Sequence, residues 1–148
     1  IGWGCSATST GMAEVLGPAK VPQVAYSSSS PFLADPVKYP YFSRTVPSDI
    51  ISTQLHAHLL QHMGWENIAV VFTDDAYGAG LGLALVEALR GTLALVRHSI
   101  SVPLNSTSVE FAKVVATLQQ DHIKVVCIYG NQAPIRMFML AAFAAGFY

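Results

Sequence analysis

The feature that most constrains the fold is a regular alternation between two kinds of apolar pattern. Short runs dense in β-branched residues span residues 21–26, 68–73, 93–100 and 124–129. Nearly continuous apolar runs of this length are typical of strands covered on both faces of a sheet. Between them, apolar residues recur every three or four positions, as they do on one face of a helix. This alternation predicts an α/β fold with parallel sheets and flanking helices, joined by right-handed crossovers.

The helical patterns are expected over residues 7–16, 51–63, 81–89, 109–118 and 136–145. The sequence Pro-Ser-Asp at residues 47–49 is a signal for the start of the second helix. That helix is expected to be amphipathic, with an apolar face made of Ile51, Leu55, Leu59 and Met63. In the fourth helix, Phe111, Val115 and Leu118 share one face.

Composition narrows the class of protein. Of 148 residues, 52% are hydrophobic and only 11% are charged, which argues against a disordered chain. The net charge is −1, and the eight Lys and Arg residues form no basic run, so we expect no nucleic-acid partner. The longest apolar stretch, residues 137–148, is shorter than the roughly 20 residues a bilayer span needs and predicts a buried helix. The first and last residues look like internal sequence, so we expect a piece of a longer protein.

Three stretches resemble catalytic, cofactor-binding or metal-binding motifs without completing them. The sequence GCSAT at residues 4–8 begins like the nucleophile turn of a serine hydrolase, but the second glycine is missing. The sequence GAGLGLA at residues 78–84 follows a strand as a dinucleotide fingerprint does, but its third glycine is out of place. His58 and His62 lie one helical turn apart, with no cysteine or carboxylate nearby to complete a metal site. We therefore expect no enzyme activity, no cofactor and no metal.

Four consecutive serines, Ser27–Ser30, follow the first expected strand. A serine run is more often a solvated linker than part of a binding site. The segment 27–49 has no helical or strand period, yet it contains large apolar side chains, including Phe32, Leu33, Tyr39 and Phe42. A flexible linker would not contain so many, so we expect an ordered, packed loop with a functional role.

Polar side chains are expected at the carboxyl ends of the strands, where open α/β sheets bind their ligands. Ser6 and Ser27–Ser30 offer hydroxyls that can bind a carboxylate. Asp49 can bind an ammonium group, and the ring of Tyr77 can lie against the same cation. Ser6 and Asp49 are equally compatible with helix capping, and Tyr77 with simple packing. Together these residues describe a site for an amino acid.

Several motifs occur together in one order and at one spacing: IGWGCSATST, VPQVAYSSSSP, YPYFSRTVPSD and GWENIAVVFTDDAYGAG. The chain resembles the ligand-binding domain shared by class C G-protein-coupled receptors and natriuretic-peptide-type receptors. Bacterial branched-chain amino-acid-binding proteins share that fold, and their YGxGL pattern is similar to residues 77–81.

The resemblance implies a type I periplasmic-binding-protein-like clamshell, with residues 1–64 in lobe 1 and residues 65–148 in lobe 2. The ligand, an amino acid or similar small molecule, is expected in the cleft between the lobes. By the resemblance, Ser6 and Ser29 hold its α-carboxylate, Asp49 and Tyr77 hold its α-amine, and Ser27 adds a nearby contact.

The function implied is that of a membrane receptor which signals by cleft closure from the extracellular side of the cell membrane. It would reach the membrane through segments outside this chain, and a dimer is compatible with the resemblance. The alternative is a soluble amino-acid-binding protein that serves a transporter. The sequence Asn105-Ser106-Thr107 is an N-glycosylation acceptor, which agrees with an extracellular location.

Overall fold

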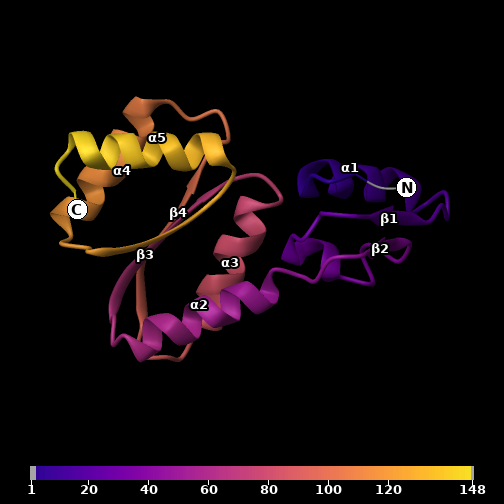
Figure 1. The fold of residues 1–148 in the computed structure, drawn as a ribbon, viewed down its shortest axis with the longest axis horizontal. Coiled ribbons are helices and arrows are strands. Elements are labelled where there is room, and N and C mark those ends of the chain that lie inside the picture. The colour runs from indigo at the N-terminus through magenta and orange to yellow at the C-terminus, as the bar shows by residue number, and fades with distance from the viewer. Residues whose placement is uncertain (1–2, 148) are drawn as a thin grey trace.

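The computed structural model describes residues 3–147, and these residues form two packing units that lie side by side (Figure 1). Residues 1, 2 and 148, which fall within the expected lobes, lie outside the described residues. The small unit comprises helix α1 (Ser6–Leu16), strand β1 (Gln23–Ala25), the 3₁₀ helix η1 (Pro31–Ala34) and strand β2 (Phe42–Arg44). β1 and β2 pair in parallel, and the buried residues Ala13, Leu33 and Tyr39 form the core beside them.

The large unit is built around a three-stranded parallel sheet with the strand order β4-β3-β5. β3 (Asn67–Thr73) lies in the centre, between β4 (Leu95–Val102) and β5 (Val125–Tyr129). The helices of this unit are α2 (Ile50–His62), α3 (Gly78–Ala88), α4 (Ser108–Gln120) and α5 (Gln132–Ala144). Within residues 3–147, none of the helices combines the length and the apolar character that crossing a membrane requires.

The two faces of the central strand are covered by different helices. Ile68, Val70 and Phe72 pack with residues of α2 and α3, whereas Ala69 and Val71 pack with residues of α4 and α5. This explains why β3 reads as an uninterrupted apolar run, since every residue from 68 to 73 is buried. The predicted α/β fold with parallel sheets and flanking helices is confirmed.

The strand expected over residues 93–100 is displaced by two residues. Leu93 is 85% exposed and precedes the strand, which runs from Leu95 to Val102. Pairing with β3, from Asn67 opposite Leu95 to Thr73 opposite Val102, sets these limits. Because β4 is an edge strand, its residues alternate between more and less exposed, and its apolar run alone does not define its ends.

The segment 27–49 is ordered and packed, as expected, and it contains two short elements that the sequence period did not reveal. Leu33 and Tyr39 are buried in the core of the small unit. η1 and β2 both lie within the segment. Each is only three or four residues long, which is too short to produce a helical or strand period in the sequence.

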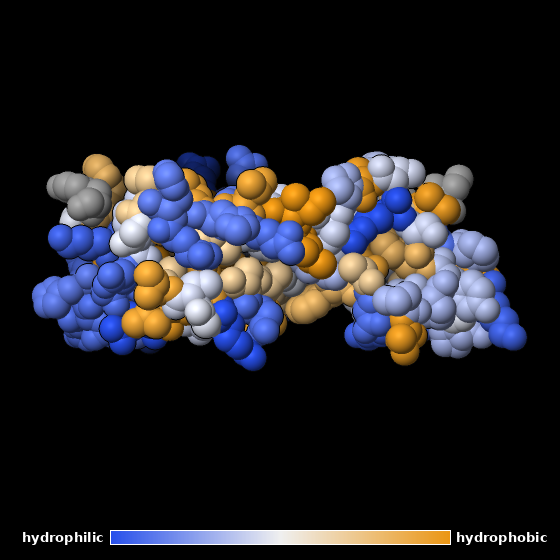
Figure 2. All heavy atoms as spheres, turned by 90° about the horizontal axis from the view of Figure 1, so that it is seen from below, coloured by the Kyte–Doolittle hydropathy of each residue, from blue (hydrophilic) through white to orange (hydrophobic). Residues whose placement is uncertain are grey.

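The apolar stripe of α2 faces solvent, which corrects the orientation that an amphipathic helix implies. Its residues Ile51, Leu55, Leu59 and Met63 are 58%, 64%, 51% and 52% exposed. The buried face of the helix carries Thr53, Ala57 and Leu60 instead. Small residues on this face allow a close approach to α3, and Ala57 and Leu60 join the core on that side of the sheet. Figure 2 views the molecule from the side where α2 lies and shows apolar side chains exposed there.

Candidate functional site

A cavity of about 510 Å³ lies between the two units, at the carboxyl ends of the strands. It contains four of the five residues that the sequence predicts for the site: Ser6, Ser27, Ser29 and Tyr77. The remaining lining residues are Gly4, Cys5, Gly130, Asn131 and Gln132. Segments far apart in the sequence therefore converge on one hollow, as the strand ends of open α/β sheets do.

The serine run alternates between the cavity and the interior of the small unit. Ser27 and Ser29 line the cavity, whereas Ser28 and Ser30 are fully buried. The Ser28 hydroxyl lies 2.7 Å from the Ser9 hydroxyl. A flexible linker does not bury alternate residues in this way, so the linker interpretation is wrong.

Asp49 lies directly behind Ser29. The Ser29 hydroxyl donates a hydrogen bond to Asp49 Oδ2 over 2.5 Å, and the Asp49 backbone N–H donates to the Ser29 carbonyl over 3.0 Å. Asp49 occupies the N-cap position of α2, but its side chain makes no capping hydrogen bond. Because a carboxylate has about four acceptor sites, the group retains capacity for a further donor.

Ser6 is the first residue of α1 and is only 4% exposed. The N-cap position belongs to Cys5, so the capping role considered for Ser6 is wrong. Instead, the Ser6 hydroxyl accepts a hydrogen bond from the Ser30 N–H over 3.2 Å. A hydroxyl that accepts one bond still has its own proton to donate, and here that donor lines the cavity.

Tyr77 stands at the start of α3, where its backbone N–H donates to Asp75 Oδ2 over 3.2 Å. Burial raises the pKa of its phenol, and the negative charges of Asp49 and Asp75 raise it further. The phenol is therefore neutral at physiological pH, and its position near two carboxylates favours a cation beside it.

Arg44, which the sequence interpretation did not select, holds the backbone of the serine run in place. Its guanidinium donates to the carbonyls of Ser28 over 3.3 Å and Ser30 over 2.9 Å. Burial lowers the pKa of Arg44, and the nearby charge of Asp49 acts against that shift. The arginine belongs to the motif YPYFSRTVPSD, but only the parallel pairing of β2 with β1 brings it to this position.

Asn131 and Gln132, at the start of α5, are the other cavity residues that the sequence interpretation missed. They follow β5 after Gly130, so the general rule that ligands bind at strand carboxyl ends would have indicated them. Their amide side chains add uncharged donors and acceptors to the side of the cavity formed by the large unit.

The three look-alike motifs have structural explanations. The hydroxyl of Ser6 in GCSAT is engaged with Ser30, as described above. In GAGLGLA, a side chain at Gly82 would collide with the Phe72 ring, so this glycine serves the packing of α3 on β3. His58 and His62 are both exposed on α2. No group of His, Cys, Asp or Glu side chains that could hold a metal is found among residues 3–147.

Comparisons with known proteins identify the family. A family model described as "Receptor family ligand binding region" matches residues 1–147. Metabotropic glutamate receptor 4 of Macaca fascicularis is 28% identical over 144 residues, which is 96% of this chain and 16% of that protein. Metabotropic glutamate receptor 6 of Oryctolagus cuniculus is 29% identical over 143 residues, 95% of this chain and 16% of that protein.

G-protein coupled receptor family C group 6 member A of Homo sapiens is 33% identical over 122 residues, 82% of this chain and 12% of that protein. The chain thus spans about one sixth or less of the length of these relatives. The resemblance to class C receptors is confirmed by relatives of that class, and the match over nearly all residues means that the chain belongs to the receptor ligand-binding region family.

Proposed function

We propose that the chain forms the ligand-binding region of a membrane receptor and that it binds an amino acid in the cavity between the two units. The observation that carries this proposal is the convergence of Ser6, Ser27, Ser29 and Tyr77 on one cavity, with Asp49 bonded to Ser29. The relatives are named as receptors, which supports a receptor over the transporter-linked alternative and over an enzyme.

The cavity offers complementary groups for the two charged ends of an amino acid. The hydroxyls of Ser6 and Ser27 donate to the α-carboxylate, together with N–H groups at the start of α1. Ser29 joins them by turning its hydroxyl proton from Asp49 to the ligand carboxylate when the ligand binds. The ring of Tyr77 and the carboxylate of Asp49 take the α-amine, where a charge-assisted bond is about twice as strong as a neutral one. Asp49 is not itself a lining residue of the cavity, but it lies behind Ser29 and meets the amine when the Ser29 hydroxyl turns away from it. The names of two relatives point to glutamate as one amino acid to test.

We propose that the small unit is part of lobe 1 and the large unit part of lobe 2, with the boundary between Arg44 and Ile50. The packing of α2 supports this division, because its buried residues Ala57 and Leu60 belong to the core around β3. Sequence alone placed the boundary after residue 64. A ligand that contacts both lobes at once favours the closed arrangement of the lobes. The resulting shift of molecules from the open to the closed arrangement is the signal.

Thiol labelling tests whether the cavity binds an amino acid. Cys5 is exposed and lines the cavity, whereas Cys127 lies on β5, where burial raises the pKa of its thiol. We expect a saturating amino acid to slow the reaction of Cys5 with a maleimide and to leave Cys127 unaffected. Mass spectrometry of the labelled peptides measures both rates. Equal Cys5 rates with and without each of the common L-amino acids would contradict the proposal.

We also propose that this region lies on the extracellular side of the cell membrane and that Asn105 carries an N-linked glycan. Asn105 is exposed in the loop between β4 and α4, so an oligosaccharide would meet no packed surface there. Protein secreted from animal cells should lose mass on treatment with an N-glycan-cleaving amidase, and the Asn105→Gln variant should not. An unchanged mass of the unsubstituted protein would contradict glycosylation.

A further inference from the structure

Ser30 forms a hydrogen bond between the two units. Its hydroxyl donates to the Ala76 carbonyl over 2.6 Å, which joins the end of the serine run to the turn between β3 and α3. Ser30 is fully buried and Ala76 is half-buried, so the bond is partly protected from competing water. Tyr77 is the next residue after Ala76, and the bond therefore fixes the part of the large unit that positions Tyr77 at the cavity.

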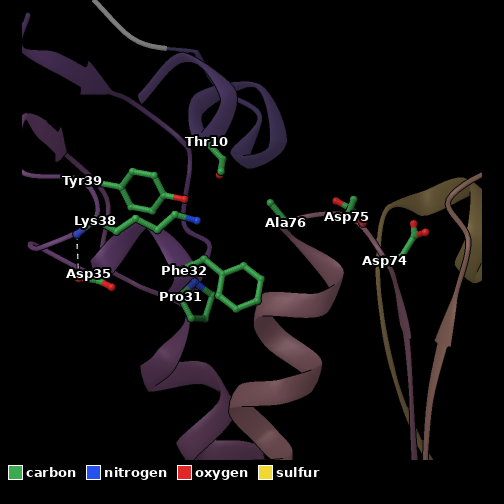
Figure 3. A pocket seen from close by; sticks show the side chains of 9 residues that line it. All are labelled: Thr10, Pro31, Phe32, Asp35, Lys38, Tyr39, Asp74, Asp75 and Ala76. Atoms are coloured by element: carbon green, nitrogen blue, oxygen red, sulfur yellow. Dashed lines mark hydrogen bonds between the residues drawn. The ribbon is translucent and has the colours of Figure 1, made fainter. Parts of the chain in front are cut away.

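The two units also pack closely together beside this hydrogen bond, at Gly80 of α3. A side-chain carbon at Gly80 would lie 2.7 Å from the Ser30 hydroxyl and 3.2 Å from Pro31 Cδ. The first turn of α3 can therefore rest on η1 only because residue 80 has no side chain. Figure 3 shows a neighbouring cavity at this junction, which is lined by Ala76 from the large unit and by Pro31 and Phe32 from the small unit.

Ser30 also contacts the parts of the site that belong to the small unit. Its N–H donates to the Ser6 hydroxyl over 3.2 Å, and its carbonyl accepts from Arg44 over 2.9 Å. One buried residue thus links a hydroxyl that we assign to the ligand carboxylate with the turn that positions Tyr77.

We infer that the Ser30–Ala76 bond is a latch that holds the two lobes in the arrangement that binds ligand, and that Ser30 is a positioning residue for Tyr77. The inference rests on the proposed function in assigning the lobes and the site. Breaking the latch lowers the fraction of molecules that are closed without ligand. Apparent affinity falls by the same factor, because only the competent fraction binds.

Ser28 provides a matched control two positions away. It is also fully buried, but its hydroxyl bonds within the small unit, to the Ser9 hydroxyl and to the Trp3 carbonyl over 3.0 Å. Both Ser28→Ala and Ser30→Ala remove a buried hydroxyl from the same loop. Only Ser30→Ala removes a bond between the units. It also removes the hydrogen bond from the Phe32 N–H to the Ser30 hydroxyl, 3.3 Å long, which caps η1, so a second variant that leaves this cap in place is needed beside it.

The first experiment measures the separation of the units without any ligand. Fluorophores on Val37→Cys and Leu93→Cys, which replace residues 88% and 85% exposed, report energy transfer in the full chain with Cys5 and Cys127 changed to Ser. We expect lower transfer efficiency in Ser30→Ala and no change in Ser28→Ala. Gly80→Ala, which disturbs the contact from the other side, should act like Ser30→Ala. Unchanged transfer in both Ser30→Ala and Gly80→Ala, or an equal fall in Ser28→Ala, would overturn the inference.

The second experiment measures binding of L-glutamate by calorimetry in the chain that keeps both cysteines. Loss of one buried hydrogen bond predicts an affinity about three- to tenfold weaker for Ser30→Ala than for Ser28→Ala. Equal affinities of the two variants would overturn the latch. If the unsubstituted chain binds neither L-glutamate nor any other common L-amino acid, the proposed function fails, and the ligand-free energy transfer decides the latch by itself.

Discussion

Replacing Asp49 with Asn is expected to weaken amino-acid binding by about 10- to 100-fold, as the loss of a charged hydrogen bond predicts. The amide oxygen of Asn can still accept the hydrogen bond that Ser29 now donates to Asp49, so the loop should keep its shape. What is lost is the negative charge, which attracts the ligand ammonium group. Isothermal calorimetry of the unsubstituted and variant chains measures the difference.

Asp35→Asn is the matched control for Asp49. Asp35 is an exposed carboxylate of the small unit, and its oxygen accepts from the backbone N–H groups of Val37 and Lys38 rather than facing the cavity of the site. We expect the affinity of the Asp35→Asn variant for the amino acid to remain within about twofold of that of the unsubstituted chain, since surface substitutions remote from a site have small effects. A loss below twofold for Asp49→Asn would show that Asp49 does not bind the amine.

Replacing Phe111 with Ala should lower the free energy of unfolding by about 3–5 kcal/mol, the usual cost of removing a large buried aromatic side chain. Phe111 is 1% exposed and packs edge-to-face on Phe138, with 6.3 Å between the ring centroids. It joins α4 to α5 on one face of the sheet, so the cavity left by Ala cannot be filled without moving a helix.

Urea denaturation followed by circular dichroism measures this effect. Val109→Ala, at a residue 62% exposed on the same helix, is the control and should change the unfolding free energy by no more than about 0.5 kcal/mol. Similar midpoints for Phe111→Ala and Val109→Ala would mean that α4 does not pack on the sheet as described.

The parts of the fold that were predictable are those in which the apolar pattern and the burial coincide. β3 is covered on both faces, and in α4 the predicted face of Phe111, Val115 and Leu118 is the buried one. In α2 the apolar stripe in the sequence is not the face that is buried. Its buried face contains Thr53 and Ala57, small residues that let α3 approach closely, while the more hydrophobic Ile51 and Leu55 remain exposed.

The site was predictable where residues directly follow strands in the sequence. Ser27 and Ser29 follow β1, Tyr77 follows β3, and the resemblance to the receptor family singled these residues out. Arg44 escaped because its contribution depends on the pairing of a three-residue strand and on the reach of a long side chain. The hydrogen bond from Ser30 to Ala76 joins the two units through residues 46 positions apart in the sequence, and no local pattern specifies such a contact.

One experiment tests directly whether the cavity binds both charged ends of an amino acid. Calorimetry on the same chain compares the amino acid that protects Cys5 with its N-acetyl derivative and its carboxamide. The N-acetyl derivative lacks the ammonium group that Asp49 and Tyr77 bind, and the carboxamide lacks the carboxylate that Ser6 and Ser29 bind. Both derivatives should therefore bind at least about tenfold more weakly than the parent amino acid. Binding of either derivative as tight as that of the parent would contradict the account.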